Sequence, residues 1–395
     1  MQFNLNDDVR FILKQLNKNG TGFLVGGALR DLTLGNDPED YDFATDIEYK
    51  KLKNIFKEYN PKEIGTHFGI IMININGKEY EIAKFRQESG IYNSRYPKSI
   101  KFVNNINIDL KRRDFTMNSL AYNEEVGLID LFGSLNDIKN KSIKFVGNPK
   151  LRIEEDSLRI MRAFRFMSKL GFNLEKKTSE AIYEKRKFLN KISRERIFDE
   201  LKMILLGKNV KKTLIEMKKL GILELIIPEF KYTYGIFIKK ENLFKSIINT
   251  VEHTPVDTIT RLSALFFNLG KINTKTIDAK GSISYDGYEK ESALIAEIQL
   301  KHLKASNEII YSVKKIVKNF TLLYKNSTKK ELKKIALDFG DKNLERLFDL
   351  MNANLNSKRT IFKNRKMKVQ NLIERMNLIK REGPIPSIKD VNITG

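Results

Sequence analysis

Two kinds of hydrophobic pattern divide the chain near residue 149. Before that point, apolar residues stand in short runs or alternate with polar ones between glycines, which is typical of β-strands. After it, apolar residues recur at spacings of three and four, with Gly or Pro interruptions, which indicates successive helices. We therefore predict an α+β fold, in which a mixed sheet with helices is followed by an all-helical remainder.

The first 135 residues contain most of the expected strands. Alternating runs that flank a short turn sequence predict hairpins, and Asn-Gly is the strongest such turn signal. The predicted elements are a helix over 1–18, a strand over 23–25, a short helix ending near Gly35, a strand over 40–46, and hairpins turning at Asn76-Gly77 and near 125–127.

The composition adds a strong positive charge to this picture. Seventy-two Lys and Arg against 49 Asp and Glu give a formal net charge of +23. Such an excess favours a polyanionic partner, most commonly a nucleic acid, although a Lys-rich coding bias is the alternative. The chain has no cysteine and three histidines, which excludes disulfides and argues against a zinc site. No apolar run approaches the ~20 residues of a membrane span, so we expect a cytoplasmic protein without a membrane partner.

Asp40 and Asp42 are the first candidates for chemistry. Two positions apart on a predicted strand, their carboxylates should point to the same face and repel each other unless a cation lies between them. Hard oxygen ligands without His or Cys suit Mg²⁺, which promotes phosphoryl transfer. The alternative is a solvated acidic pair at the end of a strand.

Gly26-Gly27 lies upstream of these aspartates, between a predicted strand and a predicted helix. Glycines at such a turn allow backbone N–H groups to approach a triphosphate, and the helix N-terminus adds a partial positive charge. Arg30, one turn into that helix, is placed to reach the same phosphates. A glycine pair alone is common in proteins, but its spacing from the aspartates makes this signal specific.

Asp156 and Arg159 form a candidate device for reading a base. Residues 151–166 have the pattern of an amphipathic helix, on which positions three apart are neighbours. Cytosine and adenine each present an amino donor beside a ring-nitrogen acceptor, which a carboxylate and a guanidinium would complement. Uracil and guanine present a carbonyl instead of that amino group. The alternative is an ordinary ion pair on a solvated helix face.

Three segments together resemble the class II tRNA nucleotidyltransferase and bacterial poly(A) polymerase family, over roughly residues 20–205. They are LVGGALRDLTLGNDPEDYDFATD, DLKRRDFTMNSLAYN and the EDSLR of LRIEEDSLRIMRAFRF. The resemblance implies a polymerase-β-like head in which catalytic Asp40 and Asp42 bind Mg²⁺. It also implies that Asp114 and Asn118 shape a ribose pocket. The nucleotide-binding residues that it implies are Gly27, Arg30, Arg113, Asp114, Asn118, Asp156, Arg159, Arg162 and Arg165.

The helical remainder departs from related sequences at several points. The segment SALFFNLGKI resembles the LLHDxGK segment of His-Asp phosphohydrolases, but Phe267 and Asn268 replace the metal ligands, and Tyr288 stands where a further histidine is expected. We therefore expect a helical body without hydrolytic metal binding, with His253 packed or at the surface. Asn93 replaces an acidic residue in the segment that relatives use to switch from C to A addition. The basic segment 358–382 is predicted to be a helix that either follows an RNA backbone or packs on its apolar stripe.

These observations predict four parts and one activity. The parts are a catalytic head over 1–137, a neck with the base-recognition helices over 138–205, a helical body over 206–330, and a basic tail over 331–395 that looks truncated. The resemblance implies template-independent addition of C, C and A to the 3′ end of tRNA from CTP and ATP, with release of pyrophosphate. The alternatives are a poly(A) polymerase, an enzyme restricted to CC or A addition, and a non-catalytic RNA-binding protein.

Overall fold

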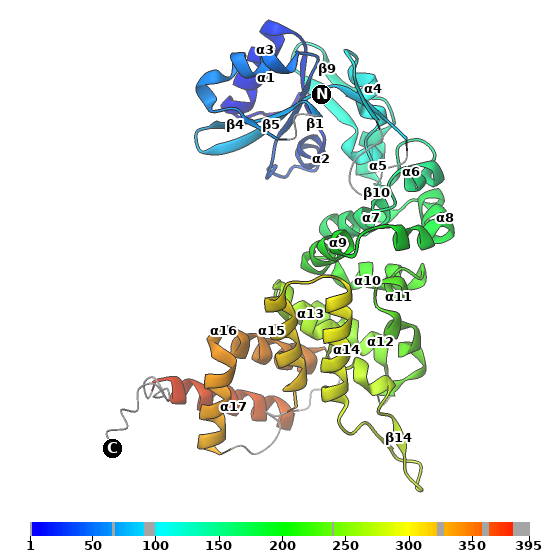
Figure 1. The fold of residues 1–395 in the computed structure, drawn as a ribbon, viewed down its shortest axis with the longest axis vertical. Helices are drawn as coiled ribbons and strands as arrows, with labels where there is room; N and C mark the ends of the chain where they lie inside the picture. The colour runs from blue at the N-terminus through cyan, green and yellow to red at the C-terminus, as the bar shows by residue number, and fades with distance from the viewer. Residues whose placement is uncertain are drawn as a thin grey trace. The chain divides into compact units, whose positions relative to one another are not determined.

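The protein forms two compact units in the computed structural model (Figure 1), which describes residues 2–64, 68–90, 99–238, 241–321, 328–357 and 363–381. The N-terminal unit comprises Met1–Met167 and Gly171–Ile192, and the C-terminal unit comprises Ser168–Leu170 and Ser193–Gly395. The finer division into head, neck, body and tail stays a prediction. Each unit is described by itself below.

A seven-stranded mixed sheet forms the centre of the N-terminal unit, which confirms the predicted α+β fold. β2 and β5 run parallel, and every other neighbouring pair is antiparallel. Phe23, Ala44 and Phe85 belong to the buried cluster that packs against this sheet. In sheet order the strands are β3 (Lys62–Glu63), β4 (Ile70–Ile75), β5 (Lys78–Lys84), β2 (Asp42–Thr45), β1 (Gly22–Val25), β8 (Leu120–Asn123) and β9 (Gly127–Asp130).

Short helices and two smaller strand pairs complete the N-terminal unit. β6 (Arg86–Ser89) pairs with β7 (Ser99–Phe102), and β10 (Ser142–Ile143) pairs with β11 (Asn173–Leu174). The helices are α1 (Asp7–Asn19), α2 (Gly27–Thr33), α3 (Tyr49–Ile55), α4 (Ile106–Lys111), α5 (Ser134–Lys139), α6 (Pro149–Glu155), α7 (Arg159–Leu170) and α8 (Lys176–Lys185), with 3₁₀ turns η1 (Lys57–Tyr59), η3 (Thr116–Asn118) and η4 (Arg186–Lys191).

The local turn signals were read correctly. Asn76 and Gly77 both have positive φ, 52° and 80°, and join β4 to β5 as the Asn-Gly sequence predicts. The second hairpin, β8 to β9, turns between Asn123 and Gly127. The predicted first helix, first strand and short second helix are also present, although the first helix begins at Asp7 and not at the start of the chain.

Two sequence predictions in this unit were wrong in geometry. Residues 151–166 do not form one helix, because α6 ends at Glu155 and Asp156 has an extended backbone, with φ −143° and ψ 101°. The Asp156 carboxylate accepts a hydrogen bond from the Leu158 N–H at 3.1 Å. The side chain thus competes with backbone carbonyls for this N–H and favours a turn over a continuous helix. Asp40 lies before β2 and not within it, since the strand begins at Asp42.

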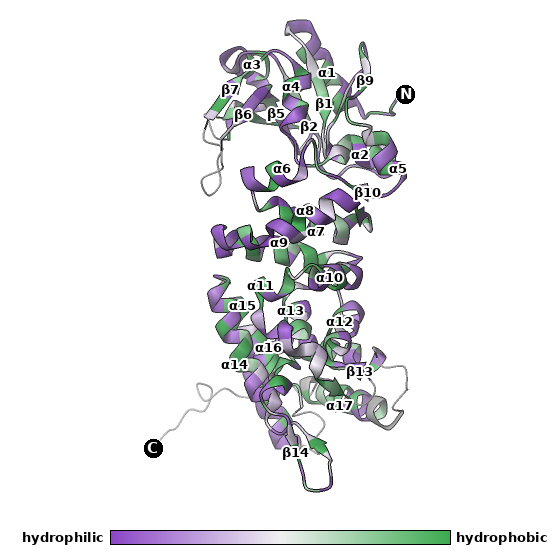
Figure 2. Cartoon of the chain, turned by 90° about the vertical axis from the view of Figure 1, so that its right-hand side faces the viewer, coloured by the Kyte–Doolittle hydropathy of each residue, from purple (hydrophilic) through white to green (hydrophobic). Residues whose placement is uncertain are grey.

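The C-terminal unit is helical, as the periodicity predicts, and Figure 2 shows apolar and polar residues mixed along these helices. Two small hairpins interrupt it, β12 (Phe237–Ile238) with β13 (Glu241–Asn242) and β14 (Thr276–Ile277) with β15 (Ile283–Ser284). The helices are α9 (Arg194–Leu206), α10 (Val210–Lys219), α11 (Leu223–Ile226), α12 (Leu243–His253), α13 (Thr258–Phe266), α14 (Tyr288–His302), α15 (Asn307–Lys318), α16 (Lys329–Asn356) and α17 (Lys363–Arg381), with 3₁₀ turns η5 (Pro228–Gly235) and η6 (Leu269–Ile272).

Tight packing occupies the positions where a phosphohydrolase would hold its metal. Phe267 is fully buried and meets Phe320 edge-on, with ring centroids 4.9 Å apart. Asn268 is buried, and Tyr288 stacks with the Lys271 ammonium at 4.3 Å. His253 is exposed, and its Nδ1 bonds the Asn249 carbonyl of its own helix at 2.8 Å.

The basic helix α17 packs through its apolar stripe, which is one of the two alternatives predicted for this segment. Val369, Leu372, Met376 and Ile379 are all buried, and α17 lies against α16. The other reading, contact with an RNA backbone, stays a prediction. In the part of the chain that the structure describes, no helix is long and apolar enough to cross a membrane. Residues 91–98, which include Asn93, lie outside the described residues, as do His67 and the tail segment 384–395.

Gly270 allows η6 to approach α14 closely, and we predict that alanine there is destabilising. A Cβ at this position would lie 2.3 Å from the Tyr288 carbonyl oxygen and 2.5 Å from the Ser292 nitrogen, so the backbone of α14 would have to move. We expect Gly270→Ala to cost about 1–3 kcal/mol, the usual range for overpacking. Urea unfolding measures the loss. Gly235→Ala is the matched control, because no atom lies within 4 Å of its Cβ. Equal midpoints for the two variants would contradict the prediction.

Candidate functional site

Gly26 brings three functional groups together at the end of β1. Its backbone, at φ 78° and ψ −136°, is one that residues with a Cβ rarely adopt. A Cβ built on Gly26 would lie 3.0 Å from Arg113 Nη1 and 3.8 Å from Asp42 Oδ2. The turn, the arginine and the aspartate therefore surround one small volume. The sequence assignment named Gly27, but Gly26 is the position where the close approach requires glycine.

The two predicted metal-binding aspartates lie close enough to influence each other. Burial raises the pKa of Asp42, Arg113 lowers it, and the negative charge of Asp40 raises it. Solvent reaches the Asp42 side chain, yet enough protein surrounds the carboxylate to desolvate it. This effect of Asp40 on Asp42 is consistent with the predicted pairing of the two carboxylates. The two residues lie where the chain enters β2, and not on one face of a shared strand.

Glu81 is a third carboxylate at this end of the sheet, and the sequence assignment missed it. It lies on β5 directly opposite Asp42 on β2, so the two side chains point to the same face. Burial raises the pKa of Glu81, and the Asp42 charge raises it further, while Arg86, Arg112 and Arg113 lower it. The pairing of β2 with β5 joins segments that are distant in sequence, and no local pattern reveals it. The alternation of polar and apolar residues along β5 shows only that Glu81 is a polar position of a hairpin strand.

The donor chemistry of Asp40 and Asp42 fits a divalent cation. Both supply hard oxygen ligands, and the pKa of Asp42 is raised, first by burial and then by the charge of Asp40, so a nearby cation would favour its ionised form. Among the described residues, no group of three or more His, Cys, Asp or Glu side chains could hold a metal ion. A Mg²⁺-type ion commonly uses one or two carboxylates together with water and substrate phosphates. The pair is therefore suited to a metal that is shared with a phosphorylated ligand.

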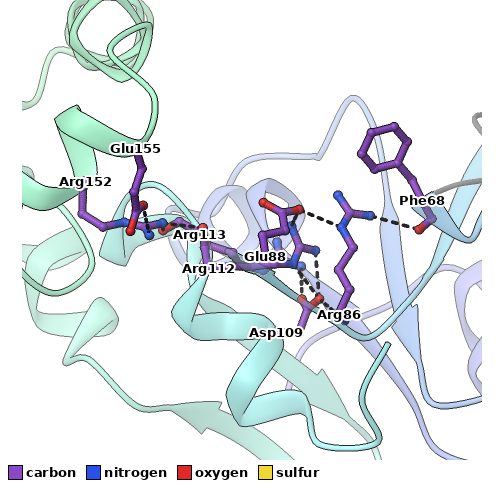
Figure 3. Close-up of polar contacts among 8 residues, drawn as sticks. All are labelled: Phe68, Arg86, Glu88, Asp109, Arg112, Arg113, Arg152 and Glu155. Carbon is purple, nitrogen blue, oxygen red and sulfur yellow. Dashed lines mark hydrogen bonds and ion pairs between the residues drawn. The ribbon is translucent and has the colours of Figure 1, made fainter. Parts of the chain in front are cut away.

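The buried carboxylate of Asp109 holds the Arg113 guanidinium in place through a hydrogen bond, as Figure 3 shows. Its Oδ2 accepts from Arg113 Nη2 at 3.3 Å, and its Oδ1 accepts from Arg112 Nε at 2.8 Å and from the Arg86 N–H at 3.2 Å. Burial by itself would raise the pKa of Asp109, but Arg112 and Arg113 outweigh burial and lower it. Arg113 is therefore held between Asp109 and the Gly26 turn.

The predicted ribose-pocket residues are engaged with arginines. Arg162 Nε and Nη2 donate to Asp114 Oδ2 at 2.8 and 2.6 Å. Arg30 Nη1 donates to Asn118 Oδ1 at 2.7 Å, while its other edge pairs with Asp31. Arg30 is buried beside Gly27. A Cβ added at Gly27 would lie 3.5 Å from Arg30 Nη2. The structure thus places Arg30 with Asn118, at the first turn of α2.

Phe166 links these arginines and was also missed. The guanidinium carbons of Arg30, Arg162 and Arg165 lie 5.5, 5.8 and 5.1 Å from the centre of its buried ring. Such distances are those of cation–π contacts. A phenylalanine in an amphipathic helix is usually a core residue, so nothing in the local pattern indicated that Phe166 lies among charged groups.

Glu155 and the main-chain carbonyl of Arg152 orient the Arg159 guanidinium. Its Nη1 donates to Glu155 Oε2 at 2.7 Å and to the Arg152 carbonyl at 2.8 Å, and the side chain is almost entirely buried. Asp156 occupies the break between α6 and α7, where the Arg159 N–H bonds the Asp156 carbonyl at 3.1 Å. The two predicted base readers thus adjoin each other through this turn.

Comparisons with known proteins match two parts of the chain, one before and one after the turn that carries Asp156 and Arg159. Residues 22–144 match the poly A polymerase head domain, and residues 171–233 match the probable RNA and SrmB-binding site of polymerase A. The first match contains the glycine turn, the acidic cluster and Arg113.

Relatives of similar sequence are described as CCA-adding enzymes. That of Lactobacillus delbrueckii subsp. bulgaricus is 41% identical over 214 residues, which is 54% of each chain. That of Bacillus licheniformis is 38% identical over 235 residues, or 59% of this chain and 56% of the relative. In these alignments the chain spans only about half the length of the relatives it matches.

Solved structures share the fold over nearly the whole chain. The Bacillus stearothermophilus CCA-adding enzyme, in complex with CTP, has a TM-score of 0.72 and 24% identity, over 95% of this chain and 83% of that one. The Thermotoga maritima CCA-adding enzyme, complexed with tRNA_CCA, has a TM-score of 0.62 and 18% identity, over 98% of this chain and 92% of that one. At these identities the likeness establishes the fold alone.

The ion pair of Asp114 with Arg162 makes a testable prediction about pH. Burial raises the pKa of Asp114, but Arg162, then Arg159 and the Phe115 N–H, outweigh it and lower the pKa to about 2. Against an unfolded value of ~3.9, this shift stabilises the fold by about 2–3 kcal/mol above pH ~4, and the gain is lost as the pH falls toward 2. The free-energy difference between wild type and Asp114→Asn, from urea unfolding, should be constant from pH 7 to 5 and shrink below pH ~4. A difference that already shrinks between pH 7 and 5 would contradict this.

Proposed function

We propose that the head and RNA-binding regions of this chain belong to the class II nucleotidyltransferases related to CCA-adding enzymes, and that the protein adds C, C and A to the 3′ end of tRNA. The substrates would be CTP and ATP, without a nucleic-acid template, and the setting would be the cytoplasm. One observation supports this most directly. Gly26, Asp42 and Arg113 surround one volume within the same compact unit as the turn that carries Asp156 and Arg159.

The proposed reaction is attack of the RNA 3′-hydroxyl on the α-phosphate of the nucleotide, which breaks the bond to the β-phosphate and releases pyrophosphate. Asp40 and Asp42 would hold Mg²⁺. When bound, that ion activates the hydroxyl and compensates charge on the phosphates. The triphosphate is placed at the Gly26-Gly27 turn, where backbone N–H groups at the start of α2 lie beside Arg113. Arg113, fixed by Asp109, supplies a positive charge at a defined place for the phosphates.

Base selection is assigned to the turn between α6 and α7. Asp156 would accept from the amino group of cytosine or adenine, and Arg159 would donate to the neighbouring ring acceptor. Glu155 and the Arg152 carbonyl fix the direction of the Arg159 guanidinium. Facing uracil or guanine, the Asp156 carboxylate would lose its donor. The loss of one charge-assisted bond costs about 1.5–3 kcal/mol, or roughly tenfold to a hundredfold in selectivity.

The ribose and the base plane have partners in the same unit. Asp114 and Asn118 are proposed to contact the ribose hydroxyls, with Arg162 and Arg30 fixing their orientations. A polar pocket of this kind rejects a deoxyribose, because its buried groups are then left unpaired. Arg165 is proposed to complete the set of arginines around Phe166 that face the nucleotide.

Because residues 22–144 match the poly A polymerase head domain, related nucleotide-adding activities are the alternatives to CCA addition. A poly(A) polymerase would produce a long A tract, whereas an enzyme restricted to CC or A addition would stop after fewer than three nucleotides. The experiment is incubation with tRNA that lacks its last three nucleotides, with CTP and ATP singly and together, followed by sequencing of the product ends. Growth by C, C and A is the expected result. A long A tract would contradict the proposal.

Asp42→Asn tests the metal-dependent step. Removing a carboxylate that orients the cation should lower the rate of nucleotide addition by at least about a hundredfold, a typical effect of one electrostatic group in an active site. Asp7→Asn is the matched control, because Asp7 is a fully exposed aspartate on α1 that has no role in the proposed site. The measurement is single-turnover addition of CMP to the shortened tRNA at fixed Mg²⁺. Addition by Asp42→Asn at the rate of the Asp7→Asn control would overturn the assignment, as expected for a non-catalytic RNA-binding protein.

A further inference from the structure

Arg152 spans two parts of the site that the proposed function treats separately. It lies on α6 with its side chain mostly buried, and its Nη2 donates to the main-chain carbonyls of both Arg112 and Arg113, the latter at 2.8 Å. Figure 3 shows this side chain directed at the arginine pair that follows α4. The carbonyls at a helix C-terminus have no partners within the helix, so one guanidinium nitrogen here satisfies two of them.

A second nitrogen of the Arg152 guanidinium contacts the turn between α6 and α7, which carries Asp156 and leads to Arg159. Arg152 Nη1 pairs with Glu155 Oε2, which also accepts from Arg159 Nη1. Arg159 Nη1 in turn donates to the main-chain carbonyl of Arg152 at 2.8 Å. These contacts form a closed ring of Arg152, Glu155 and Arg159 across the break where α6 ends. The Asp156 backbone lies within the segment that this ring encloses.

The network continues from Arg113 to the phosphate side of the site. Arg113 Nη2 donates to Asp109 Oδ2 at 3.3 Å, and Arg113 Nη1 lies against the Gly26 turn, which Asp42 also borders. A continuous set of hydrogen bonds and ion pairs, each drawn from described residues of the N-terminal unit, therefore joins Arg159 to Arg113 through Glu155 and Arg152.

We propose that Arg152 is a positioning residue that sets the place of Arg159 relative to Arg113, and so determines how well the site distinguishes cytosine from uracil. The inference rests on the proposed function, because it assumes that Arg159 reads the base and that Arg113 binds the triphosphate. A nucleotide held by its phosphates presents its base at a fixed distance from Arg113. A misplacement of about 1 Å at the reader can cost about a hundredfold in such pre-organised sites.

The chemistry of the contacts requires an arginine. A planar guanidinium presents donors along two edges, one for the Glu155 carboxylate and one for the two carbonyls. The ammonium of a lysine carries the same charge but cannot reach both sets of partners with fixed geometry. Arg152→Lys therefore keeps the charge and most of the side-chain volume while it removes the rigid connection.

The test measures the affinities of CTP and UTP by calorimetry with Mg²⁺, using the full chain. We expect the preference for CTP over UTP to fall about tenfold in Arg152→Lys, with the midpoint of thermal unfolding close to wild type. Lys150→Ala is the matched control on the same helix, since Lys150 pairs with Glu184 in solvent. It should retain the wild-type preference. An unchanged preference in Arg152→Lys, or equal weakening of CTP and UTP, would overturn the inference.

A double variant separates positioning from a direct contact. If Arg152 acts through Arg159, then Arg152→Lys should lower the CTP preference little further once Arg159→Lys is present. Independent, multiplicative losses would contradict a positioning role. A wild-type protein that binds CTP and UTP equally would contradict the proposed function itself. A wild type that selects CTP alongside an Arg152→Lys variant that selects it equally well would contradict the inference alone.

Discussion

The guanidinium group of Arg113 compensates the carboxylates at one end of the sheet, and the site in the N-terminal unit depends on this compensation. Burial raises the pKa of Asp42, Glu81 and Asp109, and the positive charge of Arg113 opposes this effect in all three. The pKa of Asp42 and Glu81 stays raised, whereas Arg112 and Arg113 together lower the pKa of Asp109. Asp42 and Glu81 lie side by side because β2 and β5 run parallel. The Gly26 turn leaves room for Arg113, since the Cβ of any larger residue would lie 3.0 Å from Arg113 Nη1. Charge, strand pairing and turn geometry thus bring ionised acids, an arginine and space for a phosphate to one place.

A second constraint acts at the break between α6 and α7. An uninterrupted helix would present Asp156 and Arg159 on the same face, but the extended backbone at Asp156 places this residue in the turn before α7. Asp156 belongs to a turn, whereas Arg159 is turned toward Glu155 and the carbonyl of Arg152. The contacts of Arg152 with the carbonyls of Arg112 and Arg113 then connect this turn to the compensated cluster. Under the proposed function, the residues that read a base and those that hold its phosphates are parts of one network.

Local signals in the sequence predicted local structure well, and long-range pairing was beyond them. The Asn76-Gly77 hairpin follows from turn chemistry that acts within four residues, and the glycine pair at 26–27 was identified for the same reason. The single helix over 151–166 was wrong because the Asp156 carboxylate bonds the Leu158 N–H, a competition that helical periodicity does not register. Glu81 was missed because only the parallel pairing of β2 with β5 places it beside Asp42. Phe166 was missed because an apolar residue on a helix reads as core, whatever charged groups the tertiary fold brings to its ring.

A crystal structure of the protein with CTP and Mg²⁺ tests the central claim most directly, namely that one network in the N-terminal unit binds both ends of a nucleotide. The account predicts triphosphate density between the Gly26-Gly27 turn and Arg113, a metal at Asp40 and Asp42, and the cytosine edge within hydrogen-bond distance of Asp156 and Arg159. A nucleotide bound elsewhere, or one whose base lies away from the turn between α6 and α7, would contradict it.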